Sequence, residues 1–138
     1  GRVAAFTQIR NRYNQPLRLK ELGKEHHLIG YIPDLLYAPE LNYLDDLVPG
    51  LTPDIRSSSI IAQHRLVAVG AGIGVLPCFI GDIDDSLTSI FPEHTISRNF
   101  WLVTHKDNRS LERIKAGKNW LLQIARQNAE ILYPKTVP

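Results

Sequence analysis

The chain has 138 residues, with 16 Lys and Arg against 14 Asp and Glu, a formal net charge of +2 and 43% hydrophobic residues. This length and apolar content suit one globular domain with a packed core, and they exclude a disordered or collagen-like chain. No apolar run reaches the roughly 20 residues that a membrane-spanning helix needs, and a lone cysteine cannot form an intrachain disulfide. The sequence contains no methionine, so we expect it to be a fragment of a longer protein.

Apolar segments separated by proline and glycine predict short strands and helices in the first half of the chain. Between residues 33 and 53 the sequence is rich in proline and mostly indicates connecting loops. The expected elements are a strand at 3–9, a helix at 17–22 ended by Gly23, a strand at 27–32, a short helix at 42–48 and a strand at 54–57.

The second half begins with a clear helical pattern. Three serines, which are favoured N-cap residues, precede apolar positions at spacings of three and four. The expected elements here are a helix from 57–59 to about 71, a glycine turn and buried strand over 70–77, a strand at 99–104 and a long helix at 110–132.

Alternating strands and helices predict an α/β fold, with a mixed sheet flanked by helices. The last helix carries a broad apolar face that includes Leu111, Ile114, Leu121, Ala125 and Leu132. A face of this width has to be buried, and the earlier elements already supply helices for their own sheet. We therefore expect this helix to belong to a second layer whose other members are missing or lie in another chain.

Net charge is divided along the sequence, being +4 over residues 1–30, −7 over 31–97 and +5 over 98–138. There is no Lys/Arg run and no interleaved aromatic pattern, so the composition does not indicate a nucleic-acid-binding surface. Solvated faces on two structural units are the simpler interpretation.

The glycines of residues 70–74 resemble a phosphate-binding loop only superficially. Such a loop follows a strand and opens a helix, whereas these glycines end a helix and open a strand. We expect Gly72 to be a left-handed helix cap, and Gly70 and Gly74 to permit close approach of neighbouring chain segments.

Catalytic and metal-binding patterns are weak. The five histidines and Cys78 lack metal-ligand spacing, and His64 has no ligand-type residue four positions away. The acidic pairs at 45–46 and 84–85 indicate the surface of a helix or a turn, and Cys78 indicates a buried, inert thiol. We therefore expect neither a cofactor nor an enzymatic activity.

Ser57, Ser58 and Ser59 are the strongest candidate for a binding site. Hydroxyls and free backbone N–H groups at the positive end of a helix suit a carboxylate, sulfate or phosphate. Equally, one serine could cap the helix while the others are simply exposed, and spacing alone favours neither interpretation.

The chain resembles the effector-binding domain of LysR-type transcriptional regulators over nearly its whole length. The segments that carry the resemblance are, in order, Ile29-Gly30-Tyr31, residues 38–44, Arg56-Ser57-Ser58-Ser59, residues 68–77, and residues 100–105 followed by an amphipathic helix.

This resemblance implies a fold like that of type 2 periplasmic binding proteins, which is Rossmann-like and has two lobes joined by two crossover strands. Residues 1–8 would hold the first crossover strand and 9–98 the second effector-binding subdomain. Residues 99–138 would hold the second crossover strand and the C-terminal helix of the first subdomain. The N-terminal DNA-binding domain and most of the first subdomain would be absent from these residues.

The resemblance also implies which residues meet the effector. Ser57, Ser58 and Ser59 at the helix start, Thr7 or Gln8 on the first crossover strand, and Phe100 on the second would line an interlobe cleft for a small anionic molecule. The implied partners are this effector, DNA through the absent domain, and further copies in a homodimer or homotetramer, in the cytoplasm and without a membrane.

Two other functions stay open on the sequence. A solute-binding protein of a transport system shares the fold and would need an export signal upstream. A nucleotide-using enzyme on an α/β scaffold is opposed by the reversed order of the glycine turn.

Overall fold

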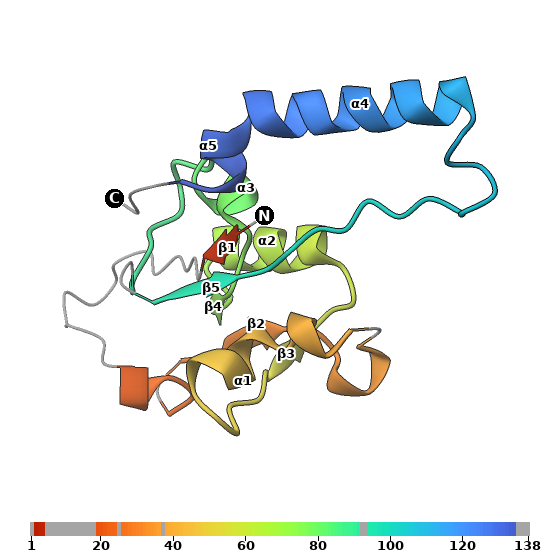
Figure 1. Cartoon of the computed structure of the whole chain (residues 1–138). Helices are drawn as coiled ribbons and strands as arrows, with labels where there is room; N and C mark the ends of the chain where they lie inside the picture. Colours follow the sequence, from red (N-terminus) through yellow and green to blue (C-terminus); the bar gives the residue numbers. More distant parts are fainter. Residues whose placement is uncertain (1, 5–18, 25, 37, 92–93, 135–138) are drawn as a thin grey trace.

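The computed structural model describes residues 2–4, 19–24, 26–36, 38–91 and 94–134. Short strands and helices alternate along it (Figure 1). In chain order the elements are the strand β1 (Arg2–Ala4), the 3-10 helix η1 (Leu19–Glu21), β2 (Leu28–Gly30), η2 (Pro33–Leu35), η3 (Pro39–Leu41), α1 (Tyr43–Leu47), β3 (Ile55–Arg56), α2 (Ile60–Ala68), β4 (Ile73–Gly74), α3 (Cys78–Gly81), β5 (Thr95–Ser97), α4 (Glu112–Gln127) and α5 (Ala129–Leu132).

A parallel sheet of order β3-β2-β4 lies at the centre of the fold. Leu28 and Ile29 of β2 are fully buried, as expected for a central parallel strand covered on both faces, and α2 packs against β2 and β4. The predicted α/β fold is therefore confirmed. The strands are divided differently from the predicted mixed sheet, because β1 and β5 form a separate antiparallel pair.

One hydrophobic cluster connects the parallel sheet with the helices around it. Its side chains come from Leu22 just after η1, from α1 and from β5, among other elements, so the cluster connects segments far apart in the sequence. Its buried members are Leu22, Leu28, Tyr43, Leu44, Ile73, Val75, Phe91 and Ile96. A smaller cluster, formed by Leu76 and Cys78 with Ile60 and Leu87 around them, lies under α2 and α3. Cys78 is buried, as expected, but it begins α3 and does not end a strand.

The glycine turn after α2 corrects one prediction. Gly70, and not Gly72, is the left-handed cap, with φ +81. The N–H of Gly70 donates to the Val67 carbonyl and that of Ala71 to the Leu66 carbonyl, which is the Schellman pattern of helix ends. Gly72 is instead a position of close approach, since an added Cβ would lie 2.4 Å from the backbone oxygen of His27.

Residues 99–104 do not form the predicted strand; they are extended and exposed, and β5 ends before them at Ser97. Trp101 and Val103 are 82% and 83% exposed. A strand requires a partner for its backbone groups, and no described strand pairs with this segment. We call residues 99–111 the arm.

The long C-terminal helix is present but divided. α4 ends at Gln127, and α5 begins at Ala129. At the break, the Asn128 side-chain amide donates to the Ile124 carbonyl at 2.9 Å, in competition with the helical backbone. None of the residues described in α4 is buried, so its apolar face is largely open in the described structure.

Arg98 connects the start of the arm to the acidic middle of the chain. Its guanidinium Nε donates to the Glu40 carbonyl at 2.7 Å, and Nη2 pairs with the Asp46 carboxylate. The guanidinium also lies over the Tyr43 ring, 5.6 Å from its centroid. Three contacts from one side chain thus fix the end of β5 against η3 and α1.

The replacement Gly72→Ala is expected to lower the free energy of unfolding by more than about 2 kcal/mol, because its Cβ would force β4 away from the His27 backbone. Gly117→Ala is the matched control: no atom lies within 4 Å of its added Cβ, so it should stabilise the chain by about 1 kcal/mol. Urea unfolding measures both, and equal effects of the two changes would contradict the close approach.

Candidate functional site

The carboxyl ends of the parallel strands β2 and β3 meet at one edge of the sheet, where ligands of open α/β sheets usually bind. Tyr31 follows β2, and Ser57 follows β3. The backbone N–H of Ser57 donates to the Gly30 carbonyl at 3.0 Å, so β2 holds the end of β3 in place. We call Ser57, Ser58 and Ser59 the serine edge.

The serines have different structural roles. Ser59 is the N-cap of α2, its hydroxyl oxygen accepting from the Ala62 N–H at 3.3 Å. The hydroxyl oxygen of Ser57 accepts from the Ser59 N–H at 3.1 Å. Ser58 is exposed and makes no hydrogen bond within the described chain. Two of the hydroxyls therefore stabilise the turn, and Ser58 is the one left available to a ligand.

The N–H groups of Ile60 and Ile61 also have no acceptor among the residues that the structure describes. They lie in the first turn of α2, where the helix dipole is positive and favours an anion. The serine edge therefore combines a free hydroxyl with free backbone donors, a chemistry suited to a carboxylate or a similar oxyanion.

Gln63 is a component of this site that sequence reasoning missed. Its side chain is 1% exposed, and its Nε2 donates to the Ser57 carbonyl at 3.0 Å. The sequence does carry a sign of this role. Gln63 is a polar residue between Ile60 and Val67 on the apolar face of α2, where an aliphatic side chain is expected unless the polar group has a hydrogen-bond partner. Gln63 thus fixes the backbone of the serine edge from the buried side of α2.

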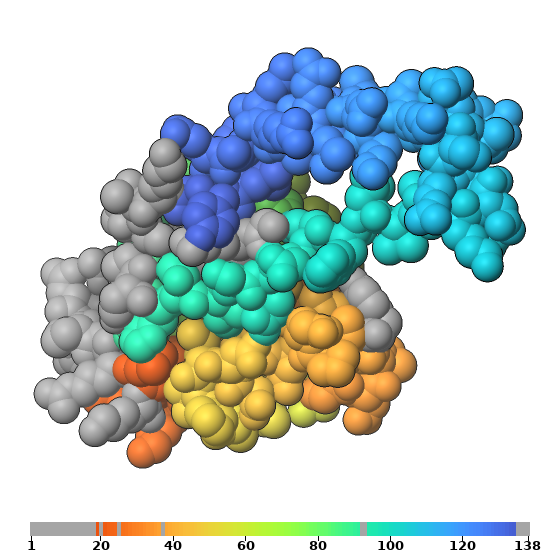
Figure 2. Space-filling view, viewed as in Figure 1, coloured from red at the N-terminus to blue at the C-terminus, as the bar shows by residue number. Residues whose placement is uncertain are grey.

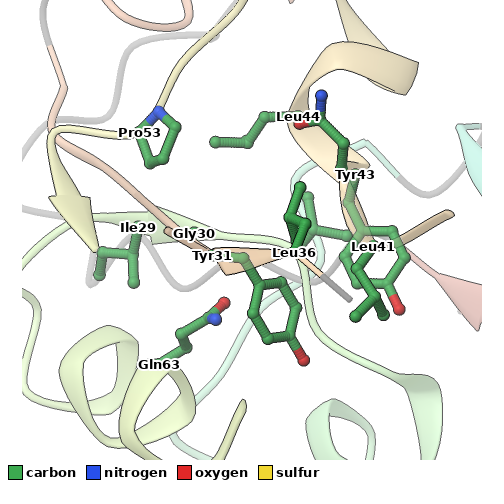
Figure 3. A pocket seen from close by; sticks show the side chains of 11 residues that line it. Ile29, Gly30, Tyr31, Leu36, Leu41, Tyr43, Leu44, Pro53 and Gln63 are labelled. Carbon is green, nitrogen blue, oxygen red and sulfur yellow. The ribbon is translucent and has the colours of Figure 1, made fainter. Parts of the chain in front are cut away.

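A small pocket lies beside this edge, between β2, α1 and α2 (Figure 3). Tyr31, Tyr43, Leu44 and Gln63 contribute side chains to its wall. The free volume is about 10 Å³, which is close to the space needed by a single water molecule. In this conformation the pocket cannot hold an organic effector.

The predicted site residues other than the serines are Thr7, Gln8 and Phe100. Thr7 and Gln8 lie outside the described residues. Phe100 is 66% exposed, and its ring contact is with Phe79 of α3, at 6.5 Å between centroids.

A second polar cluster joins α2 to the segment after α3. His64 Nε2 lies 2.7 Å from Asp84 Oδ2, and the Ser86 hydroxyl donates to Asp84 Oδ1 at 2.6 Å. Sequence spacing could not reveal this contact, because 20 residues separate His64 from Asp84. The serine and the imidazole bind different oxygens of one carboxylate, so this is not a nucleophile activated by a base. It corrects the expectation that Asp84 is only part of a surface turn.

Within the described ranges, no group of three or more His, Cys, Asp and Glu could hold a metal ion. Of the helices in that part of the chain, none is long and apolar enough to cross a membrane. Comparisons with protein-family models, curated proteins and solved structures gave no match.

The replacement Ser59→Ala is expected to destabilise the chain by about 1 kcal/mol, since it removes the N-cap of α2. Ser58→Ala removes a hydroxyl with no described partner and should leave the melting temperature unchanged. Thermal unfolding compares the two variants, for which 1 kcal/mol corresponds to about 3 °C in a chain of this size. An equal loss in both variants would show that Ser58 also stabilises the turn.

Acid unfolding tests the second cluster. Hydrogen bonds from the Ser86 hydroxyl and then from His64 lower the pKa of Asp84 from its ordinary 3.8. The ionised carboxylate therefore stabilises the fold above the unfolded-state pKa, and this stabilisation is lost as the pH falls through the lower folded-state value. Asp84→Asn should reduce stability at pH 7, and its difference from the wild type should shrink below about pH 4.

Urea unfolding between pH 7 and pH 2 measures this difference. Asp34→Asn is the matched control, because Asp34 is exposed and has no hydrogen-bond or ion-pair partner in the described ranges. It should follow the wild type throughout. A difference for Asp84→Asn that stays constant over the whole pH range would contradict the role of its carboxylate.

Proposed function

We propose that this chain is the effector-sensing part of a LysR-type bacterial transcriptional regulator, with a periplasmic-binding-protein-like fold. The serine edge carries the proposal. The segment Arg56-Ser57-Ser58-Ser59, which contributes to the sequence resemblance, lies at the carboxyl edge of a parallel sheet and opens α2. A small anionic effector would bind there to the Ser58 hydroxyl and the free N–H groups of α2.

The exposed apolar face of α4 gives the proposal a second support. In the proposed arrangement α4 packs against a first lobe, most of which is not part of these 138 residues. The apolar side chains of α4 would therefore be exposed here although the first lobe covers them in the whole regulator. The effector would bind in the cleft between the two lobes, where it contacts the closed arrangement better than the open one.

Binding would change transcription through this difference in affinity. A ligand shifts an equilibrium between two arrangements only by the difference of its binding free energies, commonly about 1–3 kcal/mol. In the proposed regulator the shift would alter the geometry of a homodimer or homotetramer, and this would change how the N-terminal domains bind DNA. The regulator would act in the cytoplasm and would need neither a cofactor nor a catalytic residue.

The coding sequence upstream of Gly1 tests the identity of the protein. We expect about 150 further residues, comprising the rest of the first lobe and a helix-turn-helix near the start. An export signal without a helix-turn-helix would overturn the proposal in favour of a solute-binding protein of a transport system.

A reporter assay with the full-length protein tests the site. Ser58→Ala should raise the effector concentration for half-maximal response about tenfold, because a hydrogen bond to a charged group contributes about 1.5 kcal/mol. Thr52→Ala is the control, since it removes an exposed hydroxyl before the opposite end of β3. An unchanged response of the Ser58 variant would remove the serine edge from the effector site.

A further inference from the structure

An open groove lies between α2 and the segment that begins with α3. Its apolar lining consists of Ile61, Phe79, Ile80 and Ile83, and Ile61 and Ile83 are 56% and 73% exposed. The groove has a volume of about 590 Å³, within the range of sites that bind small organic molecules. No residue of the serine edge lines it, so the groove is a separate candidate site.

The polar half of the lining forms one cluster. His64 and the Ser86 hydroxyl bind different oxygens of the Asp84 carboxylate. Asp85, the fourth polar residue of the lining, follows directly in the chain and is exposed. Its carboxylate makes no hydrogen bond or ion pair with any residue that the structure describes. The groove thus carries one carboxylate held by its neighbours and one that is open to a ligand.

The charge of the lining is negative. Asp84 and Asp85 are its acidic members, and none of the eight described residues that line the groove is Lys or Arg. Hydrogen bonds from Ser86 and then from His64 lower the pKa of Asp84, so this carboxylate is ionised at neutral pH. A neutral imidazole that donates from Nε2 accounts for the contact of His64 and adds no positive charge. A cationic group therefore complements the polar part of the groove.

We propose that the groove between α2 and α3 binds a small amphipathic amine. The apolar part of the ligand would pack on Phe79, Ile80 and Ile83, and an aromatic ring would suit the Phe79 side chain. The ammonium group would donate to the free carboxylate of Asp85. Burial of the apolar part supplies the binding free energy, and the carboxylates select a cation over an anion of the same shape.

The polar lining favours a small ligand over a packed helix as the occupant. A helix laid across the groove would remove Asp85 from water, which is costly for a carboxylate unless a cation is placed beside it. A small amine brings its own cation and leaves the outer side of the groove open to solvent.

The C-terminal helices lie next to this groove without closing it. α5 packs against α3, while the arm and α4 project beyond the rest of the described chain (Figure 2). No residue of these segments lines the groove, and Ile83 stays largely exposed. The inference does not rest on the proposed function, since it concerns a different site and a ligand of the opposite charge.

Nuclear magnetic resonance titration of the 138-residue chain at about pH 8, where an ordinary histidine is uncharged, tests the ligand class. The probes are 2-phenylethylamine, the uncharged 2-phenylethanol and the anion phenylacetate, which share one ring and differ in charge. The amine has few atoms, so we expect a dissociation constant of about 1–10 mM. The alcohol should bind about fivefold more weakly, and phenylacetate more weakly still. Equal binding of the amine and the alcohol, or shift changes that bypass α2 and α3, would overturn the proposal.

Variants of the lining test the site itself. Asp85→Asn should weaken binding of the amine about fivefold and leave the alcohol unchanged, because only the charged contact is lost. Ile83→Ala should weaken both ligands about threefold, because it removes apolar contact area. Asp34→Asn and Val69→Ala are the matched controls, since each makes the same kind of change at an exposed position outside the groove and should bind the amine like the wild type. Circular dichroism checks that each variant is folded. A folded Asp85→Asn variant that binds the amine as tightly as the wild type would contradict the inferred site.

Discussion

The backbone of β2 fixes the position of everything around the serine edge. This strand is fully buried, so its N–H and C=O groups must be satisfied by neighbouring chain segments and not by water. The His27 carbonyl accepts from Ile73 at 2.9 Å, and the Gly30 carbonyl accepts from Ser57 at 3.0 Å. The first contact is possible only because Gly72 carries no side chain. The second places the start of α2 at the edge of the sheet, so the candidate site depends directly on backbone pairing in the core.

The site is packed and hydrogen-bonded on its inner side and open on its outer side. Gln63 and Ser59 occupy the hydrogen-bonding groups that hold the turn together, and the adjoining pocket has almost no free volume. Ser58 and the first N–H groups of α2 face outward with no described partner. A ligand would therefore bind on the edge and not within it, and most of its surface would have to be covered from the other side. This geometry fits one wall of a ligand-binding cleft better than a complete pocket.

Sequence reasoning succeeded where a local signal determines the structure. A serine of 57–59 as the N-cap of α2, Gly23 with its positive φ and the short helix near Tyr43 follow from neighbouring residues alone. It was wrong where the outcome depends on contacts distant in sequence. Residues 99–104 have the composition of a strand but no partner strand among the described residues, and the contact of His64 with Asp84 bridges 20 residues. The exchanged roles of Gly70 and Gly72 have the same origin, because only the approach of β2 distinguishes two glycines that are equally permissive.

Arg98 has a consequence for how the two ends of the structure communicate. Its guanidinium rests on Tyr43, and Tyr43 also lines the small pocket beside β2. The arm begins at the next residue, so Arg98 is one of the contacts that hold it to the body, together with the contact of Phe100 with Phe79 and the packing of α5 on α3. A first lobe packed against α4 would in this way influence the position of Tyr43, which lines the pocket together with Gln63. The connection runs through side chains alone, because the Tyr43 ring lies under Arg98 and also lines the pocket.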